Sequence, residues 1–198
     1  MISNDNKLYG LVLSGGKSTR MGKDKGLIKY HNAPQREHLY ELLNAVCEKT
    51  FLSIRPDQLE TIPEVLNTIV DQDEFIGPYN GLLSAHRKHP DAAWLVLACD
   101  LPLIDKKALE ELILERDTAK MATAFADKNN PLPEPLCAIW EPKALATSIT
   151  YLNNGNGTCP RKFLIHNDVK LVFPERAEIL LNANSKTEYQ EALQKLTS

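Results

Sequence analysis

The sequence predicts an α/β fold, a three-layer α/β/α sandwich around a mostly parallel, Rossmann-like central sheet. Short apolar runs alternate with longer amphipathic segments, which is the pattern of a sheet covered by helices. Residues 94–98 form a continuous apolar run without polar alternation, as expected for a central strand buried on both faces. With 198 residues, 43% of them hydrophobic, the chain fits one globular domain over residues 1–198.

The first half of the chain alternates predicted strands and helices. The helix over residues 35–48 is indicated by leucines that recur on one face. The strand over residues 50–54 ends at Arg55, because the following proline excludes helical angles there. Asp105 is a good N-cap for the helix over residues 106–116. The other predicted elements are strands at 7–13, 67–70 and 94–98 and a helix from the turn at 77–81 to near His89.

The second half has a less regular pattern. We expect a helix over residues 142–152, because Pro142 suits a first helical turn. Residues 153–157 are rich in asparagine and glycine and predict a loop. The remaining predictions are strands at 121–126 and 136–140, a short helix at 161–165, extended segments at 170–173 and 178–181, and a closing helix at 187–196.

Charge and composition exclude several classes of protein. The net charge of −3 argues against a nucleic-acid binder or a protein of acidic membrane surfaces, since both need a clustered excess of Lys and Arg. No segment approaches the roughly 18 apolar residues of a membrane span. We therefore expect a cytoplasmic protein. Its cysteines are scattered and predict reduced structural thiols: Cys47, Cys99, Cys137 and Cys159.

Residues 11–25 run from an apolar strand into a glycine-rich loop. Glycine lets main-chain N–H groups approach an anion closely, and mobile cations add positive charge. The loop contains three glycines and four cations: Gly15, Gly16, Gly22, Lys17, Arg20, Lys23 and Lys25. The pattern predicts a polyphosphate site, and therefore a nucleotide-binding protein. Asp24 is expected to fix the loop by accepting hydrogen bonds.

Two common nucleotide-binding motifs do not fit this loop. A Walker A motif needs a glycine five residues before Gly16, and Leu11 occupies that position. The dinucleotide fingerprint G-x-G-x-x-G fails because Gly15 and Gly16 are adjacent. Ligands of open α/β sheets collect at the carboxyl ends of the strands, so we expect the loop, Asp71 and Asp100 to meet in one cleft.

Asp100 is the strongest metal candidate. It follows the buried strand at residues 94–98, which would hold its carboxylate rigidly at the cleft. Mg²⁺ prefers one or two such oxygen ligands together with phosphates and waters. The five histidines have no partners at the spacing of a triad or a zinc site, and we expect them to be surface or half-buried residues without a catalytic role.

The loop resembles the L-x-G-G-x-x-x-R-M-G-x-D-K signature of the nucleotidyltransferase family that includes molybdenum cofactor guanylyltransferase. The signature is matched in register from Leu13 to Lys25. Four further matches follow in order: Gly77-Pro78 with Gly81, Cys99-Asp100-Leu101-Pro102, Pro135-Leu136, and Asn182-Ala183-Asn184. The resemblance thus covers nearly the whole chain.

The resemblance implies transfer of GMP from GTP to molybdopterin, with release of pyrophosphate and with Mg²⁺ as cofactor. It also implies transient contact with proteins of molybdoenzyme maturation. Transfer of a cytidylyl or another nucleotidyl group to the molybdenum cofactor, or to a sugar or polyol phosphate, remains open. A GTP-binding module without catalysis also remains open.

The resemblance also implies roles for individual residues. Catalytic roles fall on Arg20, Lys25 and Asp100, and metal ligation on Asp100 and Asn184. The nucleotide would contact Leu13, Ser14, Gly15, Gly16, Lys17, Lys25, Asp71, Gly77, Pro78 and Asp100. The chain departs from the family pattern at Ser53, Arg55, Tyr79-Asn80 and Lys186. Arg161 and Lys162 are candidates for contact with the acceptor's phosphate.

Overall fold

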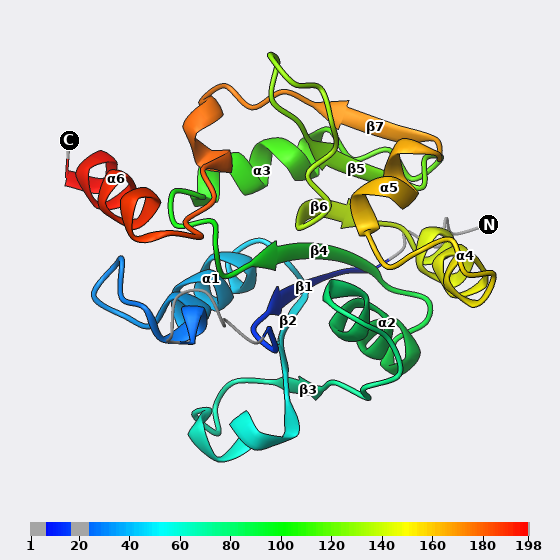
Figure 1. The fold of residues 1–198 in the computed structure, drawn as a ribbon, viewed down its shortest axis with the longest axis horizontal. Coiled ribbons are helices and arrows are strands. Elements are labelled where there is room, and N and C mark those ends of the chain that lie inside the picture. Colours follow the sequence, from blue (N-terminus) through cyan, green and yellow to red (C-terminus); the bar gives the residue numbers. More distant parts are fainter. Residues whose placement is uncertain (1–6, 17–23, 198) are drawn as a thin grey trace.

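The computed structural model describes residues 7–16 and 24–197 and is an α/β sandwich (Figure 1). Its seven strands form one sheet in the order β3-β2-β1-β4-β6-β5-β7. The strands are β1 (Leu8–Leu13), β2 (Lys49–Ile54), β3 (Thr68–Val70), β4 (Ala93–Ala98), β5 (Ala122–Phe125), β6 (Cys137–Trp140) and β7 (Val169–Val172). The predicted α/β class is confirmed.

The sheet is mostly parallel, as predicted. Strand β1 pairs in parallel with both β2 and β4, β2 with β3, and β5 with β7. Only β6 is reversed, because it runs antiparallel to β4 and to β5. The N-terminal end of β6 therefore lies at the same edge of the sheet as the carboxyl ends of its neighbours. The carboxyl ends of β1, β2, β3 and β4 meet at that edge and are free to support a site.

Helices cover both faces of the sheet (Figure 1). Leucines of α1 (Gln35–Asn44) and α3 (Lys106–Leu114) pack into one apolar cluster on one face. Side chains of α2 (Pro78–Lys88), α4 (Pro142–Asn153) and α5 (Pro160–Ile165) pack into the cluster on the opposite face. Helix α6 (Lys186–Thr197) follows as the last element. These packing faces form the three predicted layers.

Strand β4 is the central strand, and every residue in it is buried. Leu95 and Leu97 face the cluster of α1 and α3, whereas Trp94 and Val96 face the cluster of α2 and α4. Both faces of the strand are covered, which explains why its sequence is apolar without alternation. Because β4 is held from both sides, Asp100, two residues after its end, starts from a rigid support.

Several predicted boundaries need correction. The helix expected over residues 35–48 ends at Asn44, and the amide of Glu48 already donates to the carbonyl of Leu8 in the sheet. Residues 178–181 were expected to be extended, but they overlap a 3-10 helix, η3 (Ala177–Leu180), which buries Ile179 against the core. Two further 3-10 helices, η1 (Lys25–Leu27) and η2 (Pro56–Thr61), were not expected. No helix within the described residues is both long and apolar enough for a membrane span.

Candidate active site

A cavity of about 580 Å³ opens at the carboxyl ends of the parallel strands. That volume is within the usual range for a small-molecule site. The predicted site residues in its wall are Leu13, Ser14, Gly15, Gly16, Lys25, Asp71, Gly77, Pro78 and Asp100. The loop, Asp71 and Asp100 thus meet in one cleft, as the strand pattern predicts. Lys17 and Arg20 lie outside the described residues.

The start of the glycine-rich loop is fixed by the sheet. The amide of Ser14 donates to the carbonyl of Ser53 at 2.9 Å, which extends the pairing of β1 with β2 beyond Leu13. A Cβ atom placed on Gly15 would lie 2.3 Å from a carboxylate oxygen of Asp71. Only glycine fits this close approach, so the backbone of the loop lies directly against the cavity wall.

Lys25 joins the two predicted metal ligands. Its ammonium donates a hydrogen bond to Oδ1 of Asn184 and lies 3.7 Å from Oδ2 of Asp100. Asn184 is brought to this position by the segment before α6, where the amide of Ala183 donates to the carbonyl of Asp100 at 2.8 Å. Burial raises the pKa of Asp100, and the charge of Lys25 opposes that rise. Two oxygen-bearing side chains distant in sequence therefore converge on one cation.

Asp71 is a buried carboxylate at the end of β3. Its Oδ1 accepts a hydrogen bond of 2.6 Å from the hydroxyl of Ser53. Burial raises the pKa of Asp71 to about 6, although the Ser53 hydrogen bond lowers it. No ion pair of Asp71 is found among the described residues, so this carboxylate is poorly compensated in its buried position.

Gly77 and Pro78 form the start of α2 on the other side of the cavity. Gly77 has a φ of 68° and precedes the helix, and Pro78 occupies its first turn. The positive φ favours glycine, and the proline needs no backbone partner at that position. Four further lining residues come from the adjoining segment: Asp73, Phe75, Ile76 and Asn80. Sequence reasoning had named two of them, Asp73 as a residue after the strand at 67–70 and Asn80 as a departure from the family pattern.

Asp24 fixes the far end of the loop, as predicted. Its Oδ1 accepts from the amide of Gly26 at 2.9 Å, which starts η1. Its Oδ2 accepts from the side chain of Gln58 at 2.8 Å. Gln58 was not identified from the sequence. Its contacts with the loop cross more than thirty positions of the chain, and no local pattern marks them.

Arg161 does not lie in the cavity wall. Its guanidinium pairs with Glu134 and donates to the carbonyl of Pro133 at 3.1 Å. Lys162 is exposed on the same short helix. Contact of either residue with the acceptor's phosphate remains a prediction.

The donor set around Lys25 fits a hard divalent cation. A carboxylate from Asp100 and an amide oxygen from Asn184 are the ligand types that Mg²⁺ prefers when phosphates and waters complete its shell. Within the described part of the chain, no group of three His, Cys, Asp or Glu side chains could hold a metal ion. A site here would therefore depend on the substrate for its remaining ligands.

The fold and the cavity together define a class of protein, the α/β proteins with a small-molecule site at the carboxyl ends of parallel strands. Residues 10–170 match the family model described as the MobA-like NTP transferase domain. The chain belongs to this family.

Named relatives agree with that membership. The chain is 42% identical over 183 residues to the molybdenum cofactor biosynthesis bifunctional protein of Synechocystis sp.. The matched region covers 92% of this chain and 52% of that protein. The chain thus spans about half the length of that relative. It is 24% identical over 184 residues to a molybdenum cofactor guanylyltransferase of Shewanella piezotolerans, covering 91% of this chain and 89% of the relative.

A solved structure shares the fold. The molybdopterin-guanine dinucleotide biosynthesis protein A of Archaeoglobus fulgidus superposes with a TM-score of 0.79 at 20% identity, and the match covers 96% of this chain and 98% of that one. At this identity the likeness establishes the fold alone. The sandwich predicted from the sequence is therefore also the fold of that solved structure.

Proposed function

We propose that this chain transfers GMP from GTP to molybdopterin and releases pyrophosphate. One observation carries the proposal: the start of the glycine-rich loop, Asp71, Lys25 and Asp100 line a single cavity at the strand ends, and Asn184 contacts Lys25 from outside the wall. Family membership and the names of the relatives support the same reaction. We infer that residues 1–198 form one domain and that the protein acts in the cytoplasm. We also infer that it binds neither nucleic acid nor a membrane.

The chain's contribution to this reaction is positioning and charge neutralisation. Amides of the loop from Ser14 onward would bind phosphate oxygens, and Lys25 would neutralise the departing pyrophosphate. Arg20 would bind two oxygens through its planar fork. Asp71, with Gly77 and Pro78 opposite, would contact the nucleoside. An acceptor phosphate must reach the α-phosphorus from the open side of the cavity.

Asp100 and Asn184 would hold Mg²⁺, since their oxygens already meet around one cation. The ion, when bound, supplies charge stabilisation at the reacting phosphates. For it to bind, the Lys25 ammonium must move from these two side chains toward the phosphates. Contact with proteins of molybdoenzyme maturation belongs to the same proposal.

Release of pyrophosphate from each of the four nucleoside triphosphates, with and without molybdopterin, tests the proposal. We expect release only with GTP, and only when both molybdopterin and Mg²⁺ are present. Release with CTP would assign a cytidylyltransferase instead. Release with another acceptor would change the second substrate. GTP binding without any acceptor-dependent release would indicate a binding module and contradict the proposal.

A further inference from the structure

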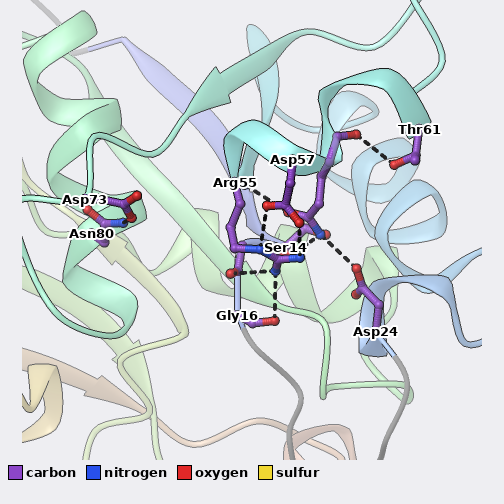
Figure 2. Close-up of polar contacts among 10 residues, drawn as sticks. Ser14, Gly16, Asp24, Arg55, Asp57, Thr61, Asp73 and Asn80 are labelled. Atoms are coloured by element: carbon purple, nitrogen blue, oxygen red, sulfur yellow. Dashed lines mark hydrogen bonds and ion pairs between the residues drawn. The ribbon is translucent and has the colours of Figure 1, made fainter.

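The 3-10 helix η2 lies behind the glycine-rich loop, and none of its residues is in the cavity wall, whereas Arg55, which precedes it, is. Pro56 begins it directly after β2, and the carbonyl of Arg55 accepts from the amide of Gln58 at 3.1 Å. Gln58 of this helix donates to the carbonyl of Ser14, and Arg55, directly before the helix, lies against the backbone of the loop (Figure 2). Neither has a role in the reaction as described above.

Gln58 joins the two ends of the loop. The residue is only 4% exposed, and its Nε2 donates to the carbonyl of Ser14 at 3.1 Å and to Oδ2 of Asp24 at 2.8 Å. Its Oε1 accepts from the amide of Arg55 at 2.9 Å. Both donor hydrogens and one acceptor of the side chain are therefore used. One glutamine connects the residue before the loop with the residue that ends it.

Arg55 holds the first turn of the loop. Its Nε and one terminal nitrogen pair with the two carboxylate oxygens of Asp57, at 2.9 and 3.2 Å. The other terminal nitrogen donates to the carbonyl of Gly15 at 3.0 Å and reaches that of Gly16 at 3.4 Å. In Figure 2 the guanidinium lies between Asp57 and Gly16. Asp57 balances the charge of Arg55. Arg55 therefore acts on the loop by orienting its carbonyls through hydrogen bonds, rather than by adding net positive charge.

These contacts determine where the amides of the loop point. In a planar trans peptide, the carbonyl of one residue and the N–H of the next point in opposite directions. Holding the carbonyls of Ser14 and Gly15 toward η2 therefore turns the amides of Gly15 and Gly16 away from it. Among the described residues, neither amide has a recorded acceptor. Both remain available to an anion in the cavity.

The support itself is anchored in the core. Thr61, at the end of η2, donates from its hydroxyl to the carbonyl of Gln58 at 2.7 Å. The carbonyl of Thr61 accepts from Arg36 of α1 at 2.9 Å, and Arg36 is only 2% exposed. The side chains behind the loop are thus attached to a buried part of the fold, which limits their movement.

We propose that Arg55 and Gln58 are positioning residues that hold the loop with its amides directed at the triphosphate before the nucleotide binds. A loop ordered in advance loses less conformational freedom on binding, so Gln58, which is outside the cavity wall, raises affinity without a direct contact. The effect falls on the phosphates and not on the base. This proposal rests on the proposed function only in that the ligand carries a polyphosphate.

Calorimetric binding of three probes tests the proposal: GTP, inorganic tripolyphosphate and guanosine, each with Mg²⁺. The variants are Q58A, Q58E, R55A and R55K, with R176A and Q194A as matched controls at exposed positions outside the cavity. We expect Q58A and R55A to weaken GTP and tripolyphosphate binding about tenfold and to leave guanosine binding unchanged. Q58E should lose more, because its carboxylate faces that of Asp24.

R55K separates the effect of the hydrogen-bond geometry of Arg55 from the effect of its positive charge. Lysine keeps the charge but has a single nitrogen, so it cannot bind both oxygens of Asp57 and the carbonyl of Gly15 as the guanidinium does. We therefore expect triphosphate binding to weaken in R55K too. If Q58A fails to fold, R55K and R55A decide the matter. Wild-type affinity for tripolyphosphate in these variants would overturn the proposal, as would an equal loss for guanosine. A wild-type chain that binds neither GTP nor tripolyphosphate would instead overturn the proposed function.

Discussion

Two buried carboxylates, one in each half of the sheet, have opposite surroundings. Glu141, after β6, is 1% exposed and accepts from two nitrogens of Arg116, at 2.8 and 3.0 Å. Asp71, after β3, is 7% exposed, and the recorded donor to its carboxylate within the described residues is the hydroxyl of Ser53, not a cation. Burial of a charge is costly unless a partner compensates it. The compensated carboxylate serves the fold, and the uncompensated one indicates a site that a ligand completes.

The same contrast extends to the rest of the two halves. Around the cavity, the pKa of Asp71 and of Asp100 is raised by burial. In the second half burial also raises the pKa of Glu134, but that carboxylate pairs with Arg161, and Lys120–Asp168 and Lys170–Glu115 are further pairs. The cavity is lined almost entirely by the first half of the chain. Among the described lining residues, Leu136 is the one that comes after Asp100 in the sequence.

The largest expected effect is on turnover in D100A. The substitution removes the fixed carboxylate next to Lys25, so kcat should fall by about 100-fold or more while the thermal unfolding midpoint stays close to that of the wild type. Steady-state pyrophosphate release and a melting curve measure the two quantities. A near-normal kcat would remove Asp100 from the proposed metal site.

R116A tests the structural half of the comparison. Without the guanidinium, Glu141 is left buried and unpaired, and we expect the free energy of unfolding to fall by about 3 kcal/mol. The folded fraction should keep its KM for GTP. Denaturant titration provides the first value and kinetics the second. A loss of GTP affinity without a loss of stability would reverse the assignment of the two halves.

K25A should act mainly on the triphosphate. The variant removes a compact charge from the cavity, so the KM for GTP should rise about tenfold and the inhibition constant for pyrophosphate should rise with it. R20A is expected to act in the same direction. The matched control is K195A, because Lys195 is on α6 outside the cavity wall. Unchanged kinetics in both K25A and R20A would place the phosphates elsewhere.

D71N gives a smaller effect that depends on pH. The folded-state pKa of about 6 lies above the ordinary value of 3.8, so the folded chain binds this proton more tightly than the unfolded chain. The stability this provides is present below about pH 4 and is lost as the pH rises through 6. At pH 7.5 D71N should therefore be more stable than the wild type by about 1 to 3 kcal/mol, and near pH 4 the two should be equal.

Denaturant titrations at both pH values measure this difference, and S53A is the companion variant. Loss of the Ser53 hydroxyl removes a hydrogen bond that favours the ionised form, so S53A should destabilise the chain most above pH 6. If D71N is equally stable or less stable at pH 7.5, the carboxylate is better compensated than its surroundings suggest.

Sequence patterns could predict the layers, the strand-end cleft and the position of Asp100, because these follow from local periodicity and from the rule for parallel sheets. They did not predict which strand is reversed, since an apolar run such as that of β6 reads the same in either direction. The segment at 178–181 was expected to be extended and is largely a 3-10 helix in which Ile179 is buried. A helix of four residues is too short to show a helical repeat of apolar residues in the sequence.

The support behind the loop shows a second limit. Arg55 was noticed only as the end of a strand and as a departure from the family pattern, and Gln58 was not noticed at all. Their roles depend on hydrogen bonds to residues 39 to 44 positions away, which no window of sequence contains. A polar side chain that becomes buried beside a loop is recognised only when the tertiary structure is known.

A crystal structure of this chain with Mg²⁺ and a non-hydrolysable GTP analogue tests the central claim most directly. The account predicts phosphate oxygens on the amides of Gly15 and Gly16, a metal ion between Asp100 and Asn184, and Lys25 moved onto the phosphates. A triphosphate bound away from the glycine-rich loop, or a metal ion without Asp100 among its ligands, would contradict it.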